Sequence, residues 1–503
     1  MIFWLAFLIC STGIAGLFFL NRDASIRNAK ALWLPVLWLW IAGSRPASDW
    51  LGIWGIGGGS GSGSALASTL DGSPMDAAIF AALIVAGIIV VVLRGQRTVA
   101  LLKASAPVLI YLLYCLISVS WSPYPEPAFK RWTKDVGDVV MVLILVTDGQ
   151  PIAALRRFFS RIGFILFPTS ILLIRYTDWG RAYDPDGGPM NVGVTTNKNS
   201  LGLIVFLVSL GALWNVLALI RDKEAPNRSW RLVAQGTLLT FGIVLLEMAH
   251  SATSVACFIL GGGLMLATSL RAIRNRPGRV RALCLVIVLA GGLAMMFGGG
   301  SVVSNALGRG DKLSGREDIW AAAIAAAGNP IIGTGFESFW NTNASKVART
   351  LVSKGFLNMP DLVSAHNGYI EVYLDLGWVG VSLITLILIS GYRHASKAFQ
   401  HDPELGSLML AYITTGTFYS ITEVGFRVLT PSWIFLLLAV VSASGFVSAG
   451  RIGAQPPEPL NAATKGRPLV LNENSVAQDN LKPFDCTGRS RKPRNLDHTF
   501  GHH

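Results

Sequence analysis

The sequence predicts an all-α, polytopic integral membrane protein with about 12–13 transmembrane helices and a large extracytoplasmic helical loop. Of its 503 residues, 52% are hydrophobic and 14% are charged, whereas a soluble domain carries about 25% charged residues. Apolar runs near the length that crosses a bilayer recur along most of the chain. These runs are continuous and lack the alternation of barrel strands, so helices are expected to satisfy the backbone in lipid.

Thirteen apolar segments are candidate spans. They fall near 1–20, 31–43, 77–93, 104–120, 136–147, 162–174, 200–220, 232–247, 252–270, 282–298, 367–391, 405–422 and 431–449. The first segment lacks a basic leader and a clear cleavage site of small residues, so we expect a retained helix and not a signal peptide. The segments 31–43 and 136–147 are the shortest.

Basic residues separate the gaps between these segments into two alternating sets. The six gaps that begin with 21–31 hold 20 Lys and Arg in 70 residues, and the six that begin with 44–76 hold 14 in 153. Cytoplasmic loops carry the excess of positive charge, so the first set is predicted to be cytoplasmic. The N-terminus is then outside and the C-terminus inside. The net charge of +13 is explained by this topology, without nucleic acid as a partner.

The predicted spans divide the chain into four parts. Residues 1–298 hold the N-terminal transmembrane helices, 299–366 form an extracytoplasmic loop, and 367–449 hold the C-terminal helices. Residues 450–503 are polar and lack apolar periodicity, which predicts a disordered cytoplasmic tail. The glycine- and serine-rich stretch 55–64 is expected to be a flexible linker.

The outer loop 299–366 is too long for a simple connector and predicts a small structured cap. Ser314 stands three residues before Glu317, a spacing typical of the first turn of a helix. An alanine-rich run continues to Ala327, and Gly328-Asn329-Pro330 ends it.

One histidine stands out by its place. His366 lies at the exit of the outer loop, whereas His394, His401 and three histidines of the tail fall in predicted cytoplasmic segments. By position alone, a histidine at a membrane surface is most often an ordinary interfacial residue. A functional role would be that of a general base, since histidine exchanges protons near neutral pH.

Arginines on the predicted outer side depart from the charge bias. They are Arg175, Arg181, Arg309, Arg316 and Arg427. Some are expected in ion pairs, since Arg316 has Glu317 and Asp318 beside it. Arg427 likewise has Glu423 four residues before it. As a cluster, such arginines could hold a diphosphate by bidentate hydrogen bonds.

Several catalytic motifs are absent from the predicted outer loops. We find no DxD cluster in a metal-ligand context, no HExxH and no GxSxG. Nucleotide sugars and ATP are not available outside the cytoplasmic membrane. A synthetic enzyme there would therefore need an activated donor delivered in the membrane, and a polyprenyl-diphosphate sugar meets that need.

An ordered set of motifs resembles the O-antigen ligase/polymerase superfamily. The motifs are Thr196-Asn197-Lys198-Asn199-Ser200-Leu201-Gly202, His250-Ser251-Ala252-Thr253-Ser254, Leu313-Ser314-Gly315-Arg316 with Ile319-Trp320, Asn329-Pro330-Ile331-Ile332-Gly333-Thr334-Gly335, and Ala365-His366-Asn367-Gly368-Tyr369 with Gly377 and Gly380. The first two are similar to exopolysaccharide polymerases of the type that build succinoglycan. The resemblance covers roughly residues 30–450. Each motif is weak alone, and the ordered set is fairly specific.

The resemblance implies a metal-independent, inverting glycosyltransferase without a cofactor, on the periplasmic face of a bacterial inner membrane. It implies that His366 deprotonates the acceptor hydroxyl and that Arg316 stabilises the leaving diphosphate. The substrate-binding residues expected with them are Arg175, Arg181, Arg309, Asn197, Asn199, Ser251, Asn367 and Arg427. Many members carry Arg or Lys where this chain has Ala252, so either His250 or one of Arg175 and Arg181 would supply the second phosphate contact.

The resemblance also implies the partners. They are a polyprenyl-diphosphate-linked oligosaccharide donor, a glycan acceptor, membrane lipid, and proteins that regulate chain length and export. The first hypothesis is a polymerase that joins such repeats into exopolysaccharide or O-antigen. An O-antigen ligase shares this chemistry and differs in its acceptor, the lipid A core. A transporter or lipid flippase is an alternative of another class, and it would predict inverted repeats that we do not see in the sequence.

Overall fold

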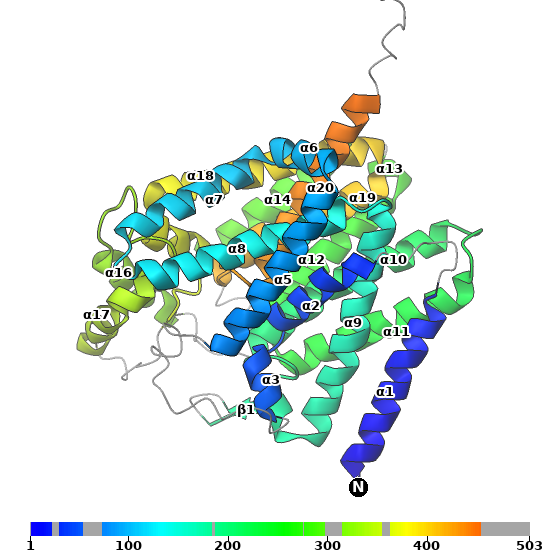
Figure 1. Cartoon of the computed structure of the whole chain (residues 1–503), viewed down its shortest axis with the longest axis horizontal. Coiled ribbons are helices and arrows are strands. Elements are labelled where there is room, and N and C mark those ends of the chain that lie inside the picture. Colours follow the sequence, from blue (N-terminus) through cyan, green and yellow to red (C-terminus); the bar gives the residue numbers. More distant parts are fainter. Residues whose placement is uncertain are drawn as a thin grey trace, which may run out of the picture. The chain divides into compact units, whose positions relative to one another are not determined.

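Long apolar helices make up almost all of the described chain (Figure 1). The computed structural model describes residues 2–22, 30–53, 73–183, 187–274, 276–296, 314–354 and 363–453. The predicted linker 55–64, Arg309 and the predicted tail from 454 onward lie outside these residues. The helix that precedes the tail continues to Gly453, so the first four residues of the predicted tail, 450–453, are helical.

The first half of the described chain contains eight α-helices and three short 3-10 helices. The α-helices are α1 (Ile2–Leu20), α2 (Trp33–Ala42), α3 (Ala47–Ile53), α5 (Pro74–Leu93), α6 (Gln96–Ala104), α7 (Ala106–Ser118), α8 (Pro125–Val146) and α9 (Pro151–Tyr176). The 3-10 helices are η1 (Lys30–Leu32), η2 (Val119–Trp121) and η3 (Asp178–Gly180). Proline in the first turn of α5, α7, α8 and α9 marks where these helices begin, because it needs no hydrogen-bond donor there.

The second half continues the helical pattern after one hairpin, β1 (Arg181–Tyr183) with β2 (Pro189–Asn191), an antiparallel pair that the sequence analysis did not predict. The helices are α10 (Lys198–Arg221), α11 (Arg228–Ala249), α12 (Ala252–Ser269), α13 (Arg271–Arg274), α14 (Pro277–Met296), α16 (Ser314–Ala326), α17 (Phe339–Ser353), α18 (Gly368–His401), α19 (Pro403–Thr422) and α20 (Pro431–Gly453). Side-chain oxygens of Asn197, Asn367 and Asp402 cap α10, α18 and α19.

Each predicted apolar segment coincides with a helix, and the all-α membrane class is confirmed. Seven described helices are long and apolar enough to cross a membrane: α1, α5, α9, α10, α11, α12 and α18. The pair α6 and α7, bent by 82° at its break, would make an eighth. The other predicted spans fall on α2, α8, α14, α19 and α20, which do not meet this criterion of length and composition.

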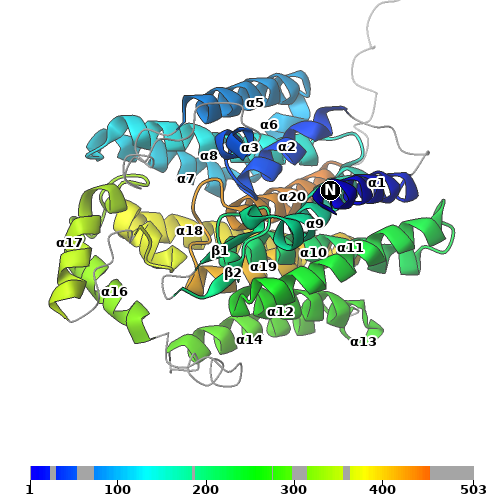
Figure 2. The same cartoon turned by 90° about the horizontal axis from the view of Figure 1, so that it is seen from below.

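The helices pack side by side around α10 and α19. Helix α10 contacts α9, α11, α12 and α20, and α19 contacts α12, α14, α18 and α20. Figure 2 shows α5, α7 and α8 on the side of the bundle away from α12 and α14. Every transmembrane side chain at the centre is therefore surrounded by other helices, which lets buried groups be held in fixed positions.

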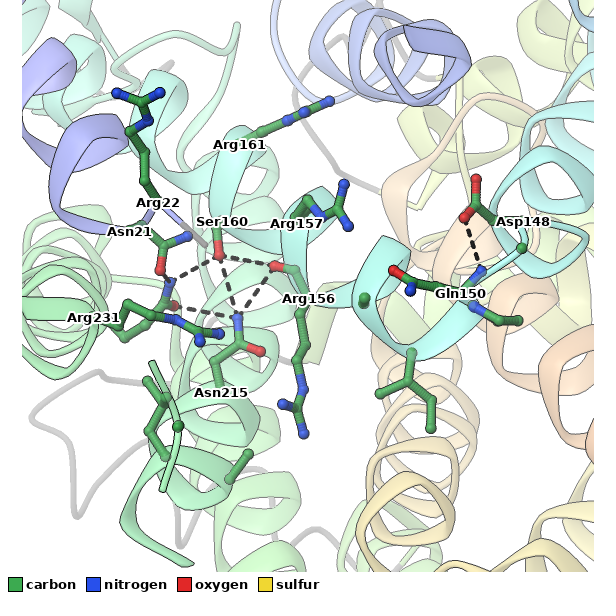
Figure 3. A pocket seen from close by; sticks show the side chains of 18 of the residues that line it. Asn21, Arg22, Asp148, Gln150, Arg156, Arg157, Ser160, Arg161, Asn215 and Arg231 are labelled. Atoms are coloured by element: carbon green, nitrogen blue, oxygen red, sulfur yellow. Dashed lines mark hydrogen bonds between the residues drawn. The ribbon is translucent and has the colours of Figure 1, made fainter. Parts of the chain in front are cut away.

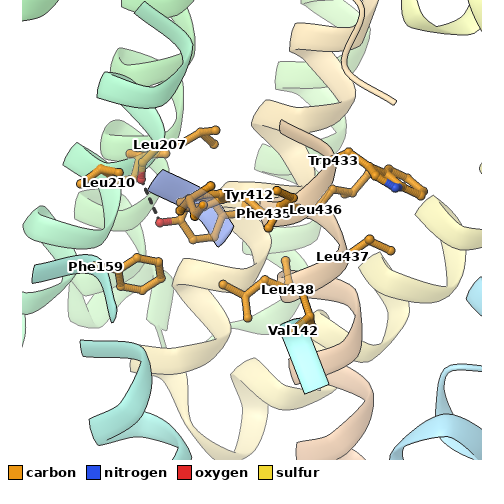
Figure 4. Close-up of a cluster of buried hydrophobic side chains, with 14 of the residues drawn as sticks. Val142, Phe159, Leu207, Leu210, Tyr412, Trp433, Phe435, Leu436, Leu437 and Leu438 are labelled. Carbon is orange, nitrogen blue, oxygen red and sulfur yellow. Dashed lines mark hydrogen bonds between the residues drawn. The ribbon is translucent and has the colours of Figure 1, made fainter. Parts of the chain in front are cut away.

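Aromatic side chains fill the place where α9, α10, α19 and α20 meet (Figure 4). The rings of Phe159 and Phe435 stack at 5.9 Å, and Tyr412 meets Phe435 edge-on at 5.1 Å. The Tyr412 hydroxyl donates to the Leu207 carbonyl at 2.9 Å, which satisfies this buried polar group. This packing holds α10 and α19 against each other, and both helices lead to the site described below.

Helices α16 and α17 lie beside the beginning of α18 (Figures 1 and 2). Helix α16 begins and ends within one residue of the prediction. Ile319 and Ala323 of α16 pack with Phe339 and Leu351 of α17 in an apolar cluster separate from the main core. Residues 314–354 thus form a small packed unit, called the cap below.

Candidate functional site

Five helix ends converge at one end of the bundle, and Glu423 lies at their centre. Helices α10, α12, α16 and α18 begin there and α19 ends there. Glu423 is the residue that ends α19, and its side chain is only 11% exposed. All five ends belong to segments that the charge bias predicts to be outside.

The Glu423 carboxylate receives three polar side chains from three different helix ends. Oε1 accepts a hydrogen bond from Nδ2 of Asn199 at 3.2 Å and lies 3.3 Å from Nη2 of Arg316. Oε2 lies 3.4 Å from Nδ1 of His366. A buried carboxylate with these three partners has its oxygens compensated, and it can orient the groups around it.

The backbone of His366 is held by its neighbours, whereas its imidazole ring is partly exposed to solvent. Its backbone is in the left-handed region at φ 51°, which is uncommon for a residue other than glycine. Neighbours hold it there: Trp320 donates to the Ala365 carbonyl at 2.7 Å, and the His366 N–H donates to Oγ of Ser364 at 3.0 Å. The side chain is 43% exposed. When Nδ1–H faces Glu423, the Nε2 lone pair remains available to take a proton.

Arg316 is anchored at the end of α19. Nη1 donates to the Thr422 carbonyl at 2.6 Å, and Nη2 pairs with Glu423. A cation is favourable at this place because the last carbonyls of a helix carry partial negative charge. The two contacts use two of the five N–H donors of the guanidinium, so donors remain for an anion.

Asn367 and the residues after it position the histidine. The Asn367 Oδ1 caps α18 by accepting from the N–H groups of Tyr369 and Ile370, and Nδ2 donates to the Ile421 carbonyl at 3.0 Å. The Gly368 N–H donates to the Glu423 carbonyl at 3.1 Å. The side chain of Asn367 is buried and both its ends are used, so its contacts join α18 to α19.

The motif 329–335 forms the support of α18 and lies away from the Glu423 contacts. Helix α18 breaks at Gly377, where φ is 63°. The N–H groups of Thr334 and Gly335 donate to the Leu374 and Asp375 carbonyls at 3.1 and 2.8 Å. The Trp378 N–H in turn donates to the Pro330 carbonyl at 2.9 Å. The motif thus satisfies the backbone groups that the break in α18 releases.

Two expected ion pairs are wrong. Arg427 pairs with Glu337 of the cap, Nε to Oε2 at 3.0 Å, and not with Glu423. The expected spacing of four applies to a helix, whereas 423–430 consists of turns. The Glu337 carboxylate raises the pKa of Arg427 above its ordinary value. Asp318, expected beside Arg316, pairs with Lys354 at 3.2 Å.

The other predicted site residues lie around this centre in different ways. Asn197 caps α10, its Oδ1 accepting from the Ser200 N–H at 2.8 Å. Ser251 is buried at the start of α12, with its Oγ 3.0 Å from Oγ of Ser254. Arg175 is exposed at the end of α9, and Nε of the exposed Arg181 donates to the Ile174 carbonyl at 3.1 Å. Arg309 is not among the described residues.

His250, the alternative second phosphate contact, ends α11 with a left-handed φ of 49°, next to the start of α12. In the part of the chain that the structure describes, no three His, Cys, Asp or Glu side chains are grouped so that they could hold a metal ion.

Glu423 is the site residue that sequence reasoning missed. It is an acidic residue directly after an apolar run, on the side where the outer loops are expected. A carboxylate at such a helix end in a membrane protein could have identified Glu423 as a candidate, since ionisable groups near the bilayer are costly and usually have partners. The expected pairing with Arg427 obscured it.

Comparison with known proteins agrees with the resemblance predicted from the motifs. A family model described as O-antigen ligase matches residues 236–385, a range that includes Arg316 and His366. The exopolysaccharide production protein ExoQ of Rhizobium meliloti (strain 1021) is 29% identical over 304 residues, 58% of this chain. The match spans 66% of that relative, just under two thirds of its length. The predicted resemblance is thereby confirmed: the chain is a multi-pass membrane protein that is similar to the O-antigen ligase family over residues 236–385 and to ExoQ.

Proposed function

We propose that the chain is a glycosyltransferase that polymerises oligosaccharide repeats carried on polyprenyl diphosphate, with its site on the periplasmic face of a bacterial inner membrane. The observation that carries this proposal is the contact of one carboxylate, Glu423, with both His366 and Arg316. Through Glu423, a candidate base and a candidate diphosphate-binding residue lie together at the predicted outer ends of the helices. The similarity to an exopolysaccharide production protein supports the product class.

The proposed reaction is a single displacement at the anomeric carbon. Nε2 of His366 takes the proton from the acceptor hydroxyl as that oxygen forms its bond to the carbon. The bond from this carbon to the diphosphate oxygen breaks, and the polyprenyl diphosphate leaves with the electron pair. Attack opposite the leaving group inverts the configuration. These steps account for the proton, the new bond and the leaving group without a metal or a cofactor.

Within this reaction Glu423 would orient the base and Arg316 would meet the leaving group. The carboxylate beside Nδ1 stabilises the imidazolium that forms when His366 accepts the proton. The remaining donors of Arg316 would stabilise the negative charge that develops on the diphosphate. Asn199 would keep the carboxylate in place from the start of α10.

The experiment is complementation of a strain that lacks the gene. His366→Ala should abolish high-molecular-weight polysaccharide and accumulate lipid-linked repeats, while the protein stays in the membrane fraction on immunoblots. His401→Ala, at the far end of α18, is the matched control and should support normal polymer. Normal polymer from His366→Ala would contradict the assignment of the base.

An O-antigen ligase is the second candidate, because the matching family model carries that description. The chemistry is the same and the acceptor would be the lipid A core. In the deletion strain, loss of secreted polysaccharide with intact lipopolysaccharide indicates a polymerase. Lipid A core without O-chain, while polymer accumulates on its lipid carrier, indicates a ligase. Chain-length regulators and export proteins are the further partners that this function implies.

A further inference from the structure

A cavity lies at the opposite end of α10 from His366. Its volume is about 1860 Å³, and it is lined by the ends of α1, α9, α10 and α11 together with parts of α6 and α20 (Figure 3). Helix α10, about 36 Å long for its 24 residues, begins at the Glu423 site, and its last turns from Asn215 onward line this cavity. The surrounding loops belong to the set that is predicted to be cytoplasmic.

The cavity wall is strongly basic. Six arginines line it, against the two carboxylates Asp148 and Asp222: Arg22, Arg97, Arg156, Arg157, Arg161 and Arg231. Asp148 already pairs with Arg94 at 3.4 Å, and Arg156 pairs with Glu404 at 2.6 Å. Figure 3 shows Arg22, Arg157 and Arg161 on the α1 and α9 sides of the cavity. The excess of guanidinium groups favours an anion there.

Two residues that line the cavity, Arg161 and Asn215, carry buried side-chain atoms without a hydrogen-bond partner among the described residues. Nη1 of Arg161 is buried and, within the described residues, has no hydrogen-bond partner. The same holds for Oδ1 of Asn215, although Nδ2 of that amide bonds to Ser160 and Gln235. A buried donor without an acceptor costs free energy, so each one in a native protein calls for an explanation such as a bound ligand.

The same cavity has apolar sides that reach the surface of the bundle. Phe18 and Phe164 line it and meet edge-on at 5.5 Å. Phe19 and Trp230 also line it and are 67% and 60% exposed. Helix α1, which forms one wall, leaves most of its apolar side chains exposed, so in a membrane this wall would face lipid. The ligand would therefore be amphiphilic.

We propose that this cavity binds the phosphate headgroup of an anionic membrane phospholipid, with the acyl chains along Phe19 and Trp230. Arg161 would supply a direct contact, since it lines the cavity and has an unused donor, while its guanidinium lies 4.5 Å from the centre of the Trp33 ring. Arg22 and Arg97 would hold the phosphate from the α1 and α6 sides. A phosphate group matches the fork of N–H donors on arginine. The inference does not depend on the proposed glycosyl transfer.

The test is lipid titration of the purified full-length protein by native mass spectrometry. The probes are dioleoylphosphatidylglycerol, dioleoylphosphatidylcholine and, as the free anion, inorganic phosphate. The cavity variant is the triple change Arg22→Gln, Arg97→Gln and Arg161→Gln. A matched control removes the same charge from exposed arginines beside α13, by Arg271→Gln, Arg274→Gln and Arg276→Gln. Arg161→Gln alone is measured in case the triple variant does not fold.

We expect the wild type and the control to bind phosphatidylglycerol at least about tenfold more tightly than phosphatidylcholine, and the cavity variant to lose this preference. Arg161→Gln should lose part of it. An equal loss in the control would mean general attraction to the surface and would overturn the site. Full retention in both cavity variants would overturn it too. Displacement of the lipid by inorganic phosphate at equal concentration would overturn the lipid part, because the free anion would then be the ligand.

Discussion

The imidazole of His366 and the carboxylate of Glu423 face each other across the ends of α18 and α19, with Nδ1 3.4 Å from Oε2. The two residues are 57 positions apart in the sequence. Their contact is reinforced along the backbone, since the Gly368 N–H donates to the Glu423 carbonyl. A carboxylate beside Nδ1 of a partly exposed imidazole is the arrangement that a base with an orienting group would have.

Glu423→Gln should lower polymer formation by roughly 10- to 100-fold, the loss expected when a charge-assisted hydrogen bond becomes a neutral one. The amide can still face His366, so the protein should remain folded. Turnover of a lipid-linked donor by purified protein measures the effect. Glu247→Gln, at an exposed position near the outer end of α11, is the matched control and should be close to wild type.

Arg316→Lys and Arg316→Ala should differ in a way that separates charge from geometry. Lysine keeps the charge, but its single ammonium group cannot reproduce the contacts that Nη1 and Nη2 make with Thr422 and Glu423. Activity should therefore fall about tenfold or more. Alanine should be worse, because Glu423 then loses its cation. Rates for both variants with saturating donor test this order. Activity of Arg316→Ala equal to that of Arg316→Lys would remove the electrostatic role.

Two alternative roles are open to Arg427. It either binds the substrate or links the cap to the turn between α19 and α20. If it only links these elements, Arg427→Met should destabilise the protein by about 1–3 kcal/mol, because the Glu337 carboxylate is only 10% exposed and would lose its contact with Nε of Arg427. Adding Glu337→Gln should then recover much of the loss in thermal stability. A substrate role predicts instead a raised KM for the donor that the second change does not repair.

The helices could be predicted from the sequence because a long apolar run indicates a segment that lies in the membrane, where the backbone must be helical. The cap helix α16 followed from Ser314, Glu317 and the Gly328 to Pro330 stop, and it begins and ends where these signals stand. Such features are local, so a single stretch of sequence carries them.

The site could be predicted only in part. His366 and Arg316 were predicted from motifs. Glu423 contacts residues from three other segments, and a local sequence pattern does not predict contacts between distant segments. The pairing expected for Arg427 failed since it assumed a helix where the chain makes turns. The break in α18 was not predicted either, because the predicted span 367–391 continues through Gly377.

The packing of the 329–335 motif on α18 leads to a prediction about stability. Gly377 has φ 63°, and a Cβ there would come within 2.2 Å of the Ile331 carbonyl oxygen. Gly377→Ala should therefore lower the unfolding temperature markedly, since both backbone strain and a backbone clash oppose it, at a cost of roughly 1–3 kcal/mol for the strain alone. Gly236→Ala in α11, where a Cβ meets nothing within 4 Å, is the control and should be neutral or slightly stabilising. Thermal unfolding of both purified variants in the same detergent measures the difference. An unfolding temperature for Gly377→Ala equal to that of the control would mean that the motif does not hold the break, and the support of His366 would have to come from Asn367 and Trp320 alone.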